Sequence, residues 1–122
     1  MIAVVDPHCP ACKAAQSQMR GVSDQLASSG IPYFVVMLSG PNSAREYFAY
    51  ADSLGLGSTA FIWRTDELQP PLSLVEMVIP SHLLLNRDGV IVDKWPGTHQ
   101  DPLVRQRMTN QITADALKRI GS

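Results

Sequence analysis

Short apolar runs alternate with amphipathic segments along this chain, and that alternation is what most constrains its fold. Residues 2–5 (Ile-Ala-Val-Val) and 31–38 (Ile-Pro-Tyr-Phe-Val-Val-Met-Leu) are apolar and rich in β-branched or aromatic side chains. Such runs are typical of strands buried on both faces. Between them, apolar side chains recur at steps of three or four residues from Ala15 to Leu26, which predicts an amphipathic helix. Gly30 follows as a candidate left-handed helix cap.

The rest of the chain predicts a second helix, a short strand, a hairpin and a last helix. Residues 43–46 (Ser-Ala-Arg-Glu) have the form of a capping box. Residues 58–64 are a candidate strand. Two apolar runs, 78–85 and 90–92, flank an Asn-Arg-Asp-Gly turn, which is a strong hairpin signal. After a polar loop, residues 108–120 have a helical pattern. In the helix opened by the capping box we expect four side chains to point inward: Tyr47, Phe48, Ala51 and Leu54.

This order of elements predicts an α/β fold, with a mixed central β-sheet, helices on both faces and a C-terminal β-hairpin plus helix. With 122 residues, 45% of them hydrophobic and 17% charged, we expect residues 1–122 to form one domain with a real core rather than a disordered chain. Because the chain begins directly in a strand, we expect it to have been trimmed from a longer chain at its N-terminus. A net charge of −1 leaves no basic field for nucleic acid.

Two cysteines are too few for a disulfide scaffold, and both lie in Cys9-Pro10-Ala11-Cys12, between the first strand and the first helix. A cysteine at a helix N-terminus faces unpaired backbone N–H groups, which favour its thiolate. Cys12, one helical turn later, could resolve a mixed disulfide formed at Cys9. Pro10 suits the first helical position. A protonated His8 would add positive charge beside Cys9.

Other interpretations of the cysteine pair stay open at this point. The cysteines could be an unreactive pair or a surface disulfide. Zinc needs four ligands, and the three histidines, His8, His82 and His99, complete no known zinc spacing, so we expect no metal site. A peroxidase would need a supporting motif around Cys9 that is absent. A non-catalytic binding module or a Cu(I)-handling chaperone remains the alternative from another class, because soft thiolates suit Cu(I).

Together with the cysteine pair, the segment Val78-Ile79-Pro80-Ser81-His82-Leu83-Leu84-Leu85-Asn86-Arg87-Asp88-Gly89 resembles the thioredoxin superfamily. The hairpin and the longer stretch before Pro80 look most like TlpA-like thiol–disulfide oxidoreductases. The run from Asp6 to Cys12 is also similar to the active-site entry of periplasmic disulfide isomerase-type proteins.

The resemblance implies a thiol–disulfide oxidoreductase in which Cys9 attacks and Cys12 resolves. It further implies a cis peptide bond between Ile79 and Pro80, which dock an extended substrate. The implied partners are protein thiol or disulfide substrates and a redox partner protein, with no bound cofactor. An extracytoplasmic or periplasmic location, a membrane tether outside the given chain and a monomeric state are likewise expectations; a cytoplasmic location stays open.

Three departures from the family bear on redox tuning. His8 stands where a Trp is frequent, and Pro10-Ala11 replaces the Gly-Pro of reducing thioredoxins, so their reduction potential cannot be carried over. The acidic residue that thioredoxins bury six positions before the first cysteine is Ala3 here.

Asp6 and, more loosely, Glu76 are then the candidate acids near the cysteines. The proline that kinks the family's active-site helix is also missing. Gly21 is the candidate for a bend in its place.

Overall fold

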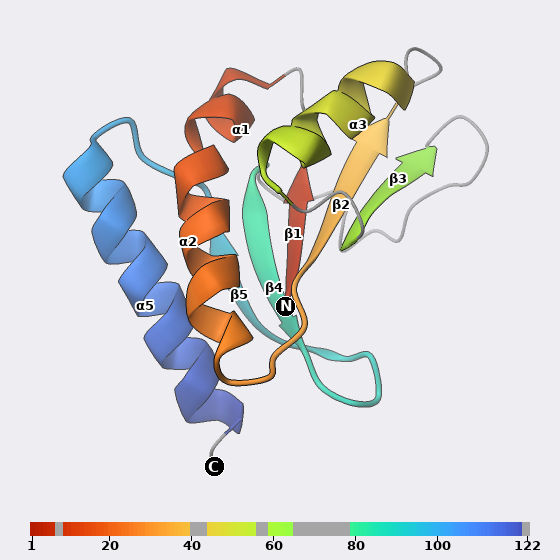
Figure 1. The fold of residues 1–122 in the computed structure, drawn as a ribbon. Coiled ribbons are helices and arrows are strands. Elements are labelled where there is room, and N and C mark those ends of the chain that lie inside the picture. Colours follow the sequence, from red (N-terminus) through yellow and green to blue (C-terminus); the bar gives the residue numbers. More distant parts are fainter. Residues whose placement is uncertain (7–8, 40–43, 56–58, 65–78, 121–122) are drawn as a thin grey trace.

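The computed structural model describes residues 1–6, 9–39, 44–55, 59–64 and 79–120, and the statements below concern these ranges. Strands and helices follow one another largely as the sequence predicts (Figure 1). In chain order the elements are β1 (Ile2–Val5), α1 (Pro10–Ala14), α2 (Gln16–Ala27), β2 (Phe34–Ser39), α3 (Ala44–Ser53), β3 (Ala60–Arg64), β4 (Ser81–Leu85), β5 (Ile91–Pro96) and α5 (Pro102–Ile120).

The sheet has five strands in the order β3-β2-β1-β4-β5, so the first strand of the chain lies at its centre. β1 pairs in parallel with β2, and β2 in parallel with β3. On the other side β1 pairs antiparallel with β4, which forms the hairpin with β5. The predicted mixed sheet with a C-terminal hairpin and helix is therefore confirmed.

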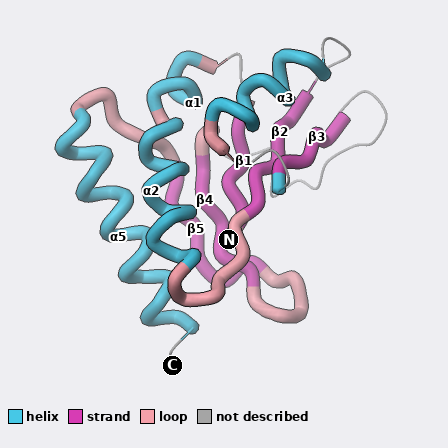
Figure 2. Tube along the Cα trace, viewed as in Figure 1, coloured by secondary structure: helices cyan, strands magenta, loops and turns pink. Residues whose placement is uncertain are grey.

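The four described helices pack on one face of this sheet (Figures 1 and 2). Both parallel crossovers, β1 to β2 and β2 to β3, move in the same direction across the sheet, and right-handed connections of that kind put their helices on one side. The sequence predicted helices on both faces of the sheet. The described residues contain the helices of one face. The core between helices and sheet comprises Met1, Ala3, Val5, Cys12, Ala15, Met19, Val22, Leu26, Tyr33, Val35, Met37, Tyr47, Tyr50, Ala51, Leu54, Leu84, Ile112 and Ala116.

Several predicted boundaries were wrong. β2 begins at Phe34 and not at residue 31, and β4 begins at Ser81 and not at residue 78. The last helix begins at Pro102, six residues before the predicted start. Its first turn is capped by Asp101, whose Oδ1 accepts the N–H of Leu103 at 2.8 Å.

The expected inward face of α3 also needed correction. Tyr47, Ala51 and Leu54 are buried, but Phe48 is 53% exposed and Tyr50 takes the buried position instead. The proposed cap at Ser43 and the stretch 65–78 lie outside the described residues.

Gly21 does not bend the active-site helix, because α2 runs unbroken from Gln16 to Ala27. Its role is close packing between helices. A Cβ built on Gly21 would stand 2.9 Å from Cγ2 of Thr109 on α5, which is closer than real side chains approach. The interruption in the helix instead falls at Ala15, between α1 and α2.

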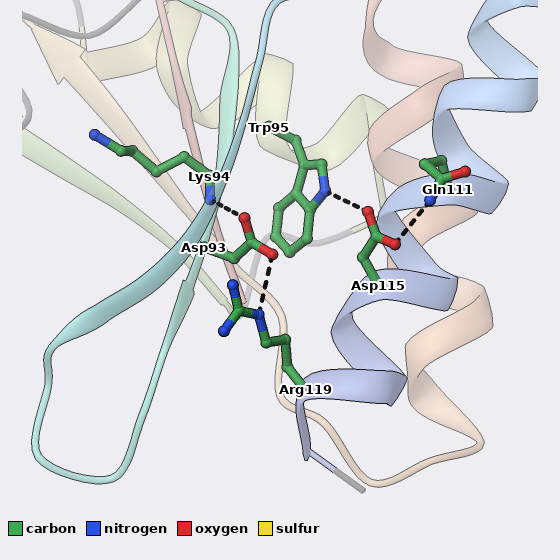
Figure 3. Close-up of polar contacts among 6 residues, drawn as sticks. All are labelled: Asp93, Lys94, Trp95, Gln111, Asp115 and Arg119. Atoms are coloured by element: carbon green, nitrogen blue, oxygen red, sulfur yellow. Dashed lines mark hydrogen bonds and ion pairs between the residues drawn. The ribbon is translucent and has the colours of Figure 1, made fainter. Parts of the chain in front are cut away.

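Polar contacts join α5 to β5, which is the edge strand at the opposite end of the sheet from β3 (Figure 3). The indole Nε1 of Trp95 on β5 donates to Oδ2 of Asp115 at 3.2 Å, and Gln111 donates to the other oxygen of the same carboxylate at 2.7 Å. Closer to the C-terminus, Arg119 lies 3.4 Å from Oδ2 of Asp93. These contacts tie the last helix to the strand that follows the Asn86–Gly89 turn.

Candidate active site

The cysteines and the Ile79-Pro80 segment meet at one edge of the sheet, where β1 ends and β4 begins. In the antiparallel pairing of these strands, Val4 lies opposite Ser81. Continuing that register places Pro80 beside Val5, immediately before the turn that leads to Cys9. Cys9 and Ile79 are both half-buried and pack against the core that contains Cys12. The structure thus brings together two segments that are far apart in the sequence, the cysteine pair and Ile79-Pro80.

Cys9 is the N-cap of α1, with extended backbone angles (φ −78°, ψ 125°) and Pro10 at the first helical position. Its N–H donates to the carbonyl of Asp6 at 3.0 Å, and its own carbonyl accepts the N–H groups of Cys12 and Lys13. Its side chain makes no capping hydrogen bond and is only half-buried. Cys9 is therefore a partly exposed residue at the start of the helix.

Cys12 differs from Cys9 in being fully buried. Burial raises the pKa of the Cys12 thiol from 9.0 to about 12, and the hydrogen bond and charge of Cys9 and the charge of Asp6 act in the same direction. The backbone N–H of Asp6, which donates to Sγ at 3.4 Å, opposes the rise. Neither cysteine is in a disulfide, so the structure shows the dithiol form with one accessible and one shielded thiol.

Tyr50 on α3 contacts the cysteine turn where the helix is interrupted. α1 ends at Ala14 and α2 begins at Gln16, with Ala15 between them. The carbonyl of Cys12 belongs to the last turn of α1. It accepts the hydroxyl of Tyr50 at 2.7 Å in a buried hydrogen bond. The sequence analysis missed this residue; its spacing of three after Tyr47 and four before Leu54 was the available signal.

The peptide bond between Ile79 and Pro80 is cis. Pro80 is buried, and its carbonyl accepts the N–H of Gly97 at 2.7 Å. Because Gly97 directly follows β5, this bond joins the two ends of the hairpin close to the cysteines. The neighbouring Thr98 in turn donates to Oε1 of the buried Gln18 on α2 at 2.6 Å, so the segment is tied to the active-site helix as well.

The other acid and histidine candidates differ in where they lie. His8 and Glu76 lie outside the described residues. Ala3 is fully buried, and Asp6 is the acid whose charge acts on Cys12. His82 is 2% exposed and shares a 2.7 Å hydrogen bond with the hydroxyl of Tyr33.

Burial of that imidazole lowers the pKa of His82 from 6.5 to about 4. His82 is therefore a neutral core residue at neutral pH, in line with its predicted place on the hairpin. His99 is exposed in the loop before α5.

Within the described ranges, no three His, Cys, Asp or Glu side chains form a group that could hold a metal ion. Within the same ranges no helix combines the length and the apolar character needed to cross a membrane.

Sequence comparison finds no protein-family model that matches the chain. No curated protein matches it either. Solved structures do. A protein assigned as the thiol:disulfide interchange protein DsbE from Chlorobium tepidum superposes with a TM-score of 0.63 at 16% identity, covering 94% of this chain and 77% of that one.

StoA from Bacillus subtilis gives a TM-score of 0.51 at 20% identity, covering 91% of this chain and 79% of that one. A protein assigned as a thioredoxin from Neisseria meningitidis gives 0.50 at 17% identity, covering 94% and 75%. At these identities the similarity speaks for the fold. The central strand, the cysteine-bearing helix and the proline-led hairpin are arranged as the sequence resemblance implies, and the chain has the thioredoxin-like fold.

Proposed function

We propose that this protein is a thiol–disulfide oxidoreductase that exchanges disulfides with protein substrates through Cys9 and Cys12. The observation that carries the proposal is the contrast between the two thiols. Cys9 is accessible at the start of a helix, whereas Cys12 is fully buried one turn later with its pKa raised to about 12. In this proposal the partly exposed Cys9 meets the protein disulfide, and the buried Cys12 makes the second, intramolecular attack.

The reaction in the reducing direction has two exchanges. The Cys9 thiolate attacks one sulfur of the substrate disulfide; a Cys9–substrate bond forms, the substrate S–S bond breaks, and one substrate thiolate leaves. Cys12 then gives up its proton and attacks Cys9. The Cys9–Cys12 bond forms and the second substrate thiolate leaves, so the substrate gains two electrons and the cysteine pair loses two. A redox partner protein returns the pair to the dithiol, and the oxidising direction reverses these steps.

The causes that raise the pKa of Cys12 suit this order of events. Burial is the largest cause that raises the pKa of Cys12, and the hydrogen bond and the charge of a Cys9 thiolate raise it further, so that Cys12 does not compete as a nucleophile. Once Cys9 is joined to substrate, its charge is gone, and Cys12 becomes easier to deprotonate. Asp6, whose charge acts on Cys12, is proposed to take up that proton.

Ile79 and Pro80 are proposed to receive the substrate chain, because they lie beside the end of β1, and Ile79 packs against the same core as Cys9. An extended substrate segment could lie along this edge while its sulfur reaches Cys9. Redox tuning is proposed for His8, Pro10 and Ala11, which immediately flank or separate the cysteines. An extracytoplasmic site of action belongs to the same proposal, through the resemblance to TlpA-like proteins.

The test uses three variants and a disulfide-linked peptide with a fluorescent reporter. We expect Cys12→Ser to accumulate a mixed disulfide with the peptide, visible as an adduct by mass spectrometry. We expect Cys9→Ser and the double variant to form none. If the wild-type protein exchanges no faster than Cys9→Ser, the proposal is wrong. Tight Cu(I) binding by that inactive protein would then favour a metal-binding module.

A further inference from the structure

The break between α1 and α2 leaves the backbone of Cys12 held by another helix. α1 ends at Ala14 and α2 begins at Gln16, so the helical pattern is interrupted three residues after Cys12. The Cys12 carbonyl accepts a buried 2.7 Å hydrogen bond from the hydroxyl of Tyr50 on α3. A buried carbonyl left without a donor would be costly, so this bond stabilises the interrupted geometry.

The same helix also holds the chain just after the break. Oγ of Ser53, the last residue of α3, donates to the Tyr50 carbonyl at 2.6 Å and accepts Nε2 of Gln16 at 3.1 Å. Gln16 is the first residue of α2. The end of α3 therefore contacts both helices that flank the break, α1 at Cys12 and α2 at Gln16.

The Tyr50 donor keeps its proton over the pH range of thiol chemistry. Burial raises the pKa of Tyr50 well above its ordinary value of 10.0, and the neighbouring Cys12 and Cys9 groups raise it further. The hydrogen bond to Cys12 is thus not lost when either cysteine ionises.

We propose that Tyr50 is a positioning residue for the resolving step, holding the Cys12 peptide so that its sulfur stays within reach of Cys9. The inference rests on the proposed exchange function, in which Cys12 attacks the Cys9 mixed disulfide. Tyr50 touches neither substrate nor reacting sulfur and acts through the Cys12 backbone. Loss of its hydroxyl lets the Cys12 turn sample more conformations, which lowers the effective concentration of one thiol at the other.

The test compares Tyr50→Phe with Tyr33→Phe. The control loses a buried tyrosine hydrogen bond of the same 2.7 Å length, but one made to His82 and not to the cysteine turn. Each protein is equilibrated with reduced and oxidised glutathione, and the dithiol and disulfide forms are counted by mass spectrometry after alkylation. The equilibrium constant measures the effective concentration of the cysteine pair.

We expect Tyr50→Phe to lower the equilibrium constant for forming the Cys9–Cys12 disulfide about fivefold, which corresponds to the loss of one hydrogen bond. We also expect it to slow the release of peptide from the Cys9 adduct. Tyr33→Phe should leave both unchanged. An unchanged or increased constant in Tyr50→Phe, or an equal fall in the control, would overturn the inference. This equilibrium needs no protein substrate. Failure of the wild type to exchange with peptides is therefore a separate result that counts against the proposed function.

A second variant covers the case in which Tyr50→Phe does not unfold cooperatively in urea. Ser53→Ala leaves Tyr50 in place and removes the two contacts that anchor it to Gln16. We expect a smaller fall in the same constant, about twofold, because these bonds are partly exposed. No change in this variant would likewise contradict a positioning role for the end of α3.

Discussion

Gly21 on α2 lies against Thr109 on α5 so closely that a Cβ at position 21 would come within 2.9 Å of Thr109 Cγ2. We expect Gly21→Ala to lower the free energy of unfolding by up to about 2 kcal/mol, because an overpacking cost of about 1–3 kcal/mol outweighs the roughly 1 kcal/mol that alanine contributes to a helix. Urea unfolding followed by circular dichroism measures the change.

The matched rescue is Thr109→Ser, which removes the clashing Cγ2. The hydroxyl that donates to the Arg105 carbonyl at 3.0 Å is kept. In this background Gly21→Ala should cost much less, and it should even be stabilising if the helices do not shift. Equal costs in both backgrounds would show that the contact does not limit the approach of α2 and α5.

Acid should destabilise the fold through His82. Its pKa falls from 6.5 to about 4 on burial, so between these values the unfolded chain binds a proton that the folded chain does not. The stability that comes from keeping this imidazole neutral is fully present above pH 6.5. It is lost progressively as the pH falls from 6.5 to about 4. We expect the wild type to lose up to about 3 kcal/mol more than His82→Gln across this window. Urea unfolding at pH 7.5 and pH 4 measures it.

His99→Gln is the control for this pH effect, because His99 is exposed. It should follow the wild-type pH profile. If His82→Gln follows that profile as well, the buried pair with Tyr33 is not the source of acid sensitivity.

Alkylation should separate the two thiols of the candidate site. In the folded protein at pH 7–8 we expect iodoacetamide to modify Cys9 and to leave Cys12 intact, since Cys12 is buried and its pKa is raised to about 12. In Cys9→Ser the rate at Cys12 should keep rising with pH past 9, because burial, the largest cause, remains. Mass spectrometry of peptides measures both. Faster modification of Cys12 would reverse the proposed roles.

The contacts between β5 and α5 should differ in weight (Figure 3). Asp115→Ala removes the acceptor of the Trp95 indole and should cost about 1–3 kcal/mol, because a partly buried N–H loses its partner. Arg119→Ala breaks an ion pair whose arginine is 56% exposed and should cost less than about 1 kcal/mol. Denaturant unfolding of the two variants compares them, and equal costs would contradict this ranking.

The sequence predicted those parts of the fold that depend on local patterns. The apolar run of β1, the left-handed Gly30 (φ 70°) and the Asp88-Gly89 turn (φ 78° at Gly89) each act through their own residues or near neighbours. The early start of α5 was also readable, since Asp101-Pro102 is a cap followed by a first-turn proline. The polar residues that follow have no clear helical pattern of apolar side chains, so the helix start was placed too late.

The rest depended on contacts between distant elements. Gly21 looked like a helix breaker because nothing in the sequence shows that Thr109 will lie over it. Phe48 and Tyr50 are both aromatic, and only the packing of α3 against the rest of the fold decides which of them is buried. The bond from Tyr50 to the Cys12 carbonyl depends on that packing too. For the same reason the two thiols could be found from the motif, but their unequal burial could not.

The central position of β1 has a consequence for how the protein folds. Its parallel partner β2 begins at Phe34, so the cysteine turn and its helix can assemble from contacts that are near in sequence. Its other partner, β4, is far along the chain, where Ser81 pairs with Val4, and closing so long a loop is slow. A newly made chain therefore acquires its thiol pair before Ile79 and Pro80 arrive beside it. The surface proposed to dock the substrate is therefore completed only when the two halves of the chain meet.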